Sequence, residues 1–84
     1  MDSAFSLDDL DQIYILVPRD FESGTVNLPV SHMSDKQFRD WITAKCEIEG
    51  ISMIVPEGRI GLETRLNMLN RLSQNGVKIY KLGG

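Results

Sequence analysis

The segment 51–82 constrains the fold most, because each of its boundaries carries a recognisable signal. A short apolar run at 51–55 is followed by turn residues at 56–58. Leucines then recur at helical spacing, and Asn75-Gly76 marks the end of that helix before a second apolar run at 77–82. The pattern predicts a strand, a turn, a helix and a further strand. The helical leucines are Leu62, Leu66, Leu69 and Leu72.

The first half of the chain predicts two more strands. Residues 12–17 alternate with apolar side chains on both faces, and Pro18 ends the run. Residues 25–30 alternate again, and Pro29 among them cannot donate to a ladder, which places that strand at a sheet edge. We expect the two strands to form a hairpin with a long polar loop.

A helix is predicted from Ser34 to Glu49. Ser34 and Gln37 have the spacing of a capping box, and Gly50 supplies a C-terminal stop. Its buried stripe is expected to be Phe38, Trp41, Ile42 and Cys46. Asp35 and Arg39 are spaced to form an i,i+4 ion pair on this helix.

These elements predict a small two-layer α/β (α+β) sandwich of the order ββαβαβ. A mixed sheet of three or four strands would carry two helices, with right-handed parallel crossovers that place both helices on one face. The expected core is drawn from every element: Ile13, Ile15, Val17, Val26, Leu28, Phe38, Trp41, Ile42, Ile51, Met53, Leu62, Leu66, Leu69, Leu72, Val77 and Ile79.

Length and composition indicate one soluble domain. The chain has 84 residues, of which 42% are hydrophobic and 25% charged. We expect a flexible acidic arm at 1–11, the α/β domain at 12–82 and a Gly-Gly tail at 83–84. The single cysteine, the absence of a long apolar run and a start unlike a signal peptide suggest a cytoplasmic protein without membrane partners. Such a small self-contained chain would suit a bacterium or a mobile element.

The leading functional hypothesis comes from a surplus of apolar side chains. If both helices cover one sheet face, the opposite face exposes large apolar residues, and contiguous patches of that kind usually mark a partner site. We therefore predict a non-enzymatic protein–protein interaction or regulatory module, one version of which is a self-associating homodimer. The predicted interaction face consists of Tyr14, Leu16, Ile54, Lys78, Tyr80 and Leu82.

Catalytic and cofactor chemistry has weak support. Cys46 and His32 are the only thiol and imidazole, and Cys46 lies on the apolar stripe of a helix. One cysteine and one histidine are too few for a zinc site. Residues 58–61 (Gly-Arg-Ile-Gly) precede a helix but lack a P-loop lysine, and Arg59 and Arg65 are expected to be solvated charges. No enzyme activity, cofactor or metal is predicted.

The end of the chain supports a second hypothesis. A strand followed by Gly83-Gly84 resembles the tail of ubiquitin-like modifiers and sulfur carriers, and the early hairpin followed by a helix resembles their β-grasp order. The resemblance implies a conjugation tail at Gly83 and Gly84. The long helix at 62–74 departs from that fold.

A third hypothesis is a binder of single-stranded nucleic acid. Tyr14, Lys78 and Tyr80 lie on predicted strands, and aromatic residues on an open sheet stack bases in RNA-binding proteins. The formal net charge of −3 argues against nucleic acid as a partner, because phosphate binding needs a concentrated basic surface.

Overall fold

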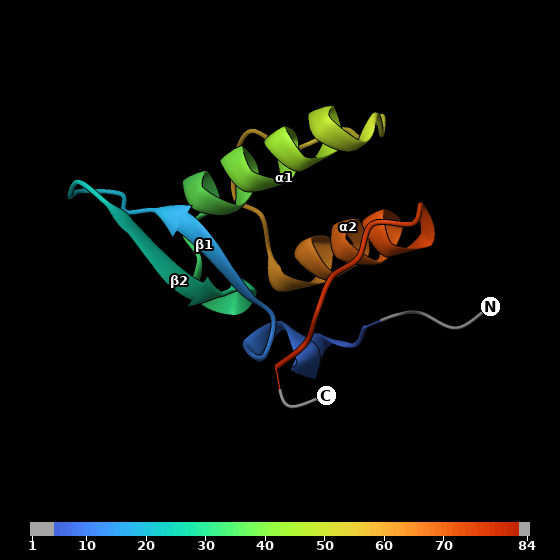
Figure 1. The fold of residues 1–84 in the computed structure, drawn as a ribbon, viewed down its shortest axis with the longest axis horizontal. Helices are drawn as coiled ribbons and strands as arrows, with labels where there is room; N and C mark the ends of the chain where they lie inside the picture. The colour runs from blue at the N-terminus through green and yellow to red at the C-terminus, as the bar shows by residue number, and fades with distance from the viewer. Residues whose placement is uncertain (1–4, 83–84) are drawn as a thin grey trace.

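A computed structural model describes residues 5–82 of the chain and shows a small α+β fold (Figure 1). The predicted α+β class with two long helices is confirmed. The elements are, in order, a 3-10 turn η1 (Leu7–Asp11), the strands β1 (Tyr14–Pro18) and β2 (Thr25–Pro29), a 3-10 turn η2 (Val30–His32), and the helices α1 (Asp35–Glu49) and α2 (Leu62–Gln74).

β1 and β2 form the expected antiparallel hairpin, with Tyr14 opposite Pro29 and Leu16 opposite Asn27. Ladder bonds join Val30 N–H to the Ile13 carbonyl (2.9 Å) and Arg19 N–H to the carbonyl of residue 24 (3.1 Å). Bonded and non-bonded pairs alternate along such a ladder, so Pro29 occupies a non-bonded position where its missing N–H breaks no ladder bond.

Both long helices begin and end where local signals place them. The Ser34 hydroxyl accepts a bond from Gln37 N–H (3.0 Å), and the Gln37 side chain accepts one from Ser34 N–H (2.8 Å). Gly50 ends α1 with a left-handed backbone (φ 71°), which glycine adopts without steric cost. The capping box and the glycine stop predicted for α1 are therefore confirmed.

The sheet has two strands within residues 5–82, not the predicted three or four. The run 51–55 remains irregular: Ile51 N–H bonds the Cys46 carbonyl and thereby caps α1 (2.9 Å). Further along, Arg39 donates to the carbonyls of Pro56 (2.9 Å) and Gly58. The run is therefore bonded to α1 at its first residue and has no neighbouring strand. Arg39 holds the loop that follows the run, and the expected Asp35–Arg39 ion pair does not form.

The other missing strand, residues 77–82, forms one hydrogen bond beside β1, at the residue range just before that strand begins. Val77 N–H bonds the Leu72 carbonyl at the end of α2 (3.0 Å), and Leu82 N–H bonds the Gln12 carbonyl just before β1 (2.7 Å). Figure 1 shows the segment meeting β1 at its start and diverging from it beyond that point. It runs opposite to β1, so the predicted parallel crossover is wrong.

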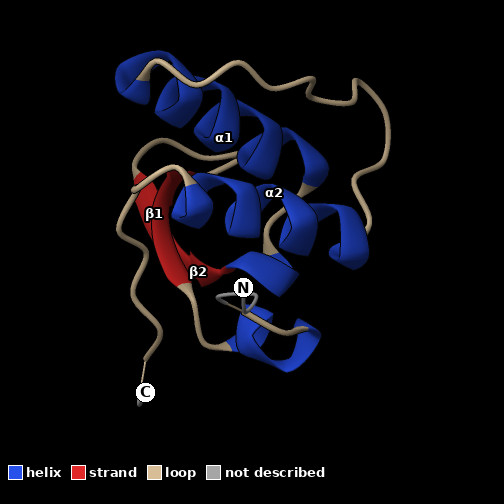
Figure 2. Cartoon of the chain, turned by 90° about the vertical axis from the view of Figure 1, so that its right-hand side faces the viewer, coloured by secondary structure: helices blue, strands red, loops and turns tan. Residues whose placement is uncertain are grey.

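Both helices lie on the same side of the hairpin (Figures 1 and 2). The inward side chains Ile13 and Val17 are buried against them, and Ile15 is half-buried. The predicted core is largely found, but Leu62 is exposed. Buried residues outside the expected core and the predicted α1 stripe are Leu10, Val30, Met33, Ile60 and Met68.

The described part of the predicted flexible arm is packed on the domain. Leu10 in η1 is fully buried, and Phe5 N–H bonds the Asn70 side-chain oxygen (2.8 Å). Lys81 Nζ lies 3.0 Å from Asp9 Oδ1, which ties η1 to the C-terminal segment. Asp9, in the acidic arm expected to be flexible, thus forms an ion pair with a residue near the other end of the chain.

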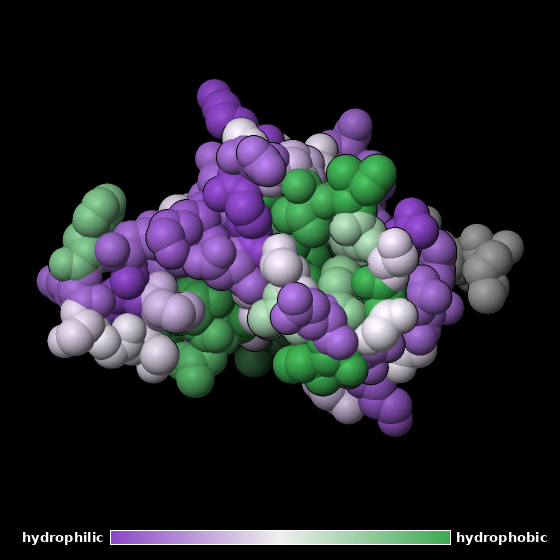
Figure 3. Space-filling view, turned by 90° about the horizontal axis from the view of Figure 1, so that it is seen from above, coloured by the Kyte–Doolittle hydropathy of each residue, from purple (hydrophilic) through white to green (hydrophobic). Residues whose placement is uncertain are grey.

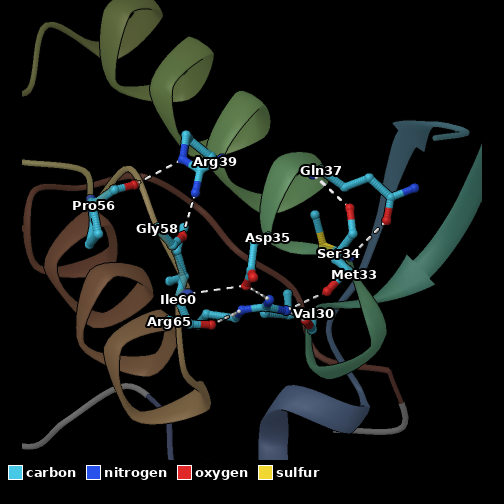
Figure 4. Close-up of polar contacts among 10 residues, drawn as sticks. All are labelled: Val30, Met33, Ser34, Asp35, Gln37, Arg39, Pro56, Gly58, Ile60 and Arg65. Atoms are coloured by element: carbon cyan, nitrogen blue, oxygen red, sulfur yellow. Dashed lines mark hydrogen bonds and ion pairs between the residues drawn. The ribbon is translucent and has the colours of Figure 1, made fainter.

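A buried arginine joins the two helices (Figure 4). Arg65 is 5% exposed, and its guanidinium donates to the carbonyls of Val30 (2.6 Å), Met33 (2.8 Å) and Ile60 (2.8 Å) and to Asp35 Oδ1 (3.0 Å). The prediction that Arg65 is a solvated charge is therefore wrong. Its partners come from η2, from the start of α1 and from the loop before α2.

Candidate functional site

The outer edge of β1 combines unused hydrogen-bonding capacity with exposed apolar side chains. The ladder bonds at Ile13 and Arg19 show that odd-numbered residues of β1 direct their backbone groups toward β2. The even-numbered residues Tyr14 and Leu16 direct theirs away from β2. β1 therefore presents an edge that no third strand covers within the described residues.

Both ends of this edge are tied to the rest of the fold. The Gln12 carbonyl accepts from Leu82 N–H (2.7 Å), and the Pro18 carbonyl accepts from Gln37 Nε2 (2.9 Å). Between these bonds, the N–H and C=O groups of Tyr14 and Leu16 have no hydrogen-bond partner among residues 5–82. Unpaired strand-edge groups of this kind are a template for pairing with another extended chain.

A notch of about 180 Å³ opens beside this edge. One wall is β1 itself, the second is the segment 78–80, and the third is α1 through Trp41 and Lys45. In Figure 1, the ribbon of β1 diverges from α1 at one end and from the C-terminal segment at the other. Half-buried Ile15 and Ile79 give the notch an apolar lining.

The α1 residues at this edge follow one helical stripe that sequence reasoning missed. Gln37, Trp41 and Lys45 are spaced by four residues and so lie on one side of α1. Gln37 bonds the end of β1, and the other two line the notch. The sequence signal for this stripe is the four-residue spacing, with Gln37 one turn before Trp41 and Lys45 one turn after it.

The structure brings most of the predicted interaction face together. Tyr14, Lys78 and Tyr80 line the notch, while Tyr14, Tyr80 and Leu82 line an adjoining hollow next to Gln12. Leu16 follows Tyr14 on the same face of β1 and is 65% exposed; Tyr80 is 77% exposed. We call Tyr14, Leu16, Lys78, Tyr80 and Leu82 the edge surface.

Ile54 does not belong to the edge surface. It is 93% exposed and lines a separate cleft of about 400 Å³ between residues 52–56 and α2, together with Met68 and Arg71. Figure 3, a view from above, shows apolar surface gathering over the end of the molecule opposite the hairpin tip, interrupted by polar side chains. The backbone at 52–56 beside this cleft is irregular and forms no strand.

The charges at the notch are basic although the whole chain is acidic. Lys45 and Lys78 both line it, and neither forms an ion pair within residues 5–82. No carboxylate lines the notch in the described structure. The nearby Lys81 is neutralised by Asp9, whose pKa is held below its ordinary value by a hydrogen bond from the Ser6 backbone and by Lys81.

The loop at 58–61 satisfies its polar groups internally. Asp35 Oδ1 accepts a bond from Ile60 N–H (3.0 Å), and Arg65 Nε donates to the Ile60 carbonyl (Figure 4). The Ile60 bond and then Arg65 lower the pKa of the Asp35 carboxyl. A protein carboxylate thus occupies the position next to Arg65 that an anion would take.

The single thiol has the environment of a structural cysteine. Cys46 is buried on α1, its Sγ lies 3.9 Å from Met53 Sδ, and burial raises its pKa. A raised pKa lowers the fraction of reactive thiolate at neutral pH. His32 is exposed in η2 and does not contact Cys46 by any hydrogen bond in the structure described.

The Gly83-Gly84 tail lies outside the described residues. Within residues 5–82, no helix combines the length and apolarity needed to cross a bilayer, and no group of three or more acidic, histidine or cysteine side chains is placed to hold a metal ion. No protein family, curated protein or solved structure matches this chain.

Proposed function

We propose that this protein is a non-enzymatic interaction module that binds another polypeptide through the edge surface. The observation that supports it most is the coincidence of two features at one place: the unpaired backbone groups of Tyr14 and Leu16, and the exposed apolar side chains of Leu16, Tyr80 and Leu82. Hydrogen-bonding capacity gives a partner an orientation, and apolar area gives it affinity.

The proposal involves no catalytic step. Cys46 is buried with a raised pKa, and Arg65 is fully used in holding the two helices. The partner is either a second copy of this chain, as the homodimer hypothesis has it, or a different protein. Either partner would cover the edge surface and exclude water from it.

Site-specific photo-crosslinking tests this proposal. A benzophenone amino acid would replace Tyr80 or Leu16 in separate variants, and Ile48 in a matched control, because Ile48 is an equally exposed apolar residue on α1. We expect a discrete adduct with one protein from the Tyr80 and Leu16 positions, in the cell that naturally makes the chain, and none from Ile48. Absence of an adduct, or the same adducts at all positions, would overturn the proposal.

Light scattering of the purified protein separates the two kinds of partner. A dimer that dissociates in a Tyr80→Glu variant identifies a second copy as the partner, since a buried carboxylate at an apolar contact is strongly unfavourable. A monomer at all concentrations, combined with a discrete adduct in the cell, identifies a different protein. Conjugation through the Gly83-Gly84 tail is an alternative proposal. It expects an activating enzyme to adenylate the C-terminus, and deletion of Gly83 and Gly84 to abolish conjugation.

A further inference from the structure

We infer that the notch beside β1 binds an extended, acidic peptide segment of a partner protein, which adds to the hairpin as a third strand. This inference rests on the proposed function and specifies its partner.

The backbone of β1 determines the geometry of binding. The N–H and C=O of Tyr14 and of Leu16 point into the notch side of the strand, in the spacing that an added strand requires. The bonds at Gln12 and Pro18 limit the length of the open edge. Between these two bonds, the N–H and C=O groups of Tyr14 and Leu16 are the ones open to a short extended segment.

The side chains determine the composition of the segment. Alternate residues of an added strand point to opposite faces. One set would lie on the α1 side, beside Ile15, Trp41 and Lys45. The other set would lie on the outward side, beside Leu16, Lys78 and Tyr80. Each side thus offers apolar surface and one lysine without an acidic partner within residues 5–82, which a segment of mixed apolar and acidic residues complements.

The charges favour this occupant over a second copy. β1 itself contains no acidic residue, so pairing β1 with its own copy would leave Lys45 and Lys78 unneutralised. It would also bring the lysines of both copies to one contact, and like charges across an interface are unfavourable. An acidic strand removes this repulsion and supplies complementary charge.

The test uses a defined probe, an amide-capped peptide of alternating glutamate and valine, seven residues long. One control peptide carries N-methyl groups on alternate backbone amides, which removes edge hydrogen bonds and keeps every side chain. A second control has lysine in place of glutamate. Binding is followed by fluorescence anisotropy, and amide hydrogen exchange by NMR locates the bound peptide.

We expect the probe to slow exchange at the Tyr14 and Leu16 amides at least about tenfold, because both become hydrogen-bonded. The amides of Ile15 and Val17, which already bond β2, serve as internal references. Affinity for the N-methylated or lysine peptide should be at least about tenfold weaker. Equal binding of the three peptides, or no binding by the probe, would overturn the inference.

Protein variants provide the reciprocal test. Leu16→Pro removes an outward N–H that no ladder bond uses and should abolish binding, since proline is tolerated where a strand N–H faces away from its neighbour. Lys45→Glu with Lys78→Glu should weaken binding about tenfold, and Lys36→Glu, on the exposed face of α1, should not. If Leu16→Pro fails to fold, the lysine variants and the N-methylated peptide still test whether an acidic strand binds at β1.

Two outcomes separate this inference from the proposed function. A discrete crosslinked partner without peptide binding retains the edge surface as a contact site but rejects an acidic strand as its occupant. No crosslinked partner rejects the proposed function itself. Displacement of the probe by a single-stranded oligothymidylate at lower concentration would overturn the inference in favour of nucleic acid stacked on Tyr14 and Tyr80.

Discussion

Arg65 Nη2 and Asp35 Oδ1 lie 3.0 Å apart and join the first turn of α1 to the first turns of α2. The contact is asymmetric, because Arg65 is buried and Asp35 is partly exposed to solvent. The same guanidinium lies over the Phe38 ring, 5.3 Å from its centroid. A single arginine therefore satisfies several buried carbonyls and packs against the core.

Replacing Arg65 with lysine should destabilise the protein strongly. One ammonium group cannot reach the carbonyls of Val30, Met33 and Ile60 together, and unsatisfied buried acceptors are costly. We expect the free energy of unfolding to fall by about 3 kcal/mol in urea denaturation. Arg71→Lys, on the exposed side of α2, is the control and should change it little. Equal stability of the two variants would contradict this account.

The contribution of Asp35 should depend on pH. Its pKa in the folded protein lies below its ordinary value because Ile60 N–H, and then Arg65, bond the carboxylate. A group with a lowered folded pKa stabilises the protein above its unfolded pKa, and this stabilisation is lost as pH falls through the folded pKa. Wild type should therefore exceed Asp35→Asn in urea midpoint at neutral pH, with the difference shrinking below about pH 4. Asp40→Asn, at an exposed ion pair, should show little difference at either pH. A gap that is constant with pH would contradict the linkage.

Leucines within η1 should differ sharply in their importance. Leu10 is fully buried, whereas Leu7 is about half exposed. Leu10→Ala should lower the free energy of unfolding by about 3 kcal/mol through lost burial and a cavity. Leu7→Ala should change it by less than about 0.5 kcal/mol, as surface substitutions usually do. Urea denaturation measures both. Similar small effects would mean that residues 7–11 contribute nothing to the core.

The Cys46 thiol should react slowly in the folded protein. Its burial and raised pKa both reduce the exposed thiolate. A chromogenic disulfide reagent should modify it fully in denaturant and much more slowly under native conditions. Ala44→Cys, made together with Cys46→Ser, places a thiol on the exposed side of α1 and should react at once. Immediate modification of native Cys46 would contradict the packing described for α1.

The sequence alone determined the elements whose signals are local. The capping box of Ser34 and Gln37, the stop at Gly50 and the leucine spacing of α2 depend on contacts within a few residues, so the helices were predicted with their bounds. The hairpin was predicted for the same reason, since its loop and alternation are short-range. Most of the edge surface follows from the alternation in β1 and in residues 77–82, which place their even-numbered side chains outward.

Tertiary structure decided where backbone groups find partners at long range. Runs 51–55 and 77–82 have strand-like composition, but a strand needs a neighbour along its length. Here only the N–H groups of Ile51, Val77 and Leu82 bond other parts of the described chain, so neither run has a ladder. Arg65 looked like a surface charge because its acceptors come from residues 30–60. The open edge of β1 exists for the same reason, because residues 77–82 bond only Gln12, just before that strand. Where a segment of this kind lies relative to β1 depends on long-range packing, which a sequence pattern does not contain.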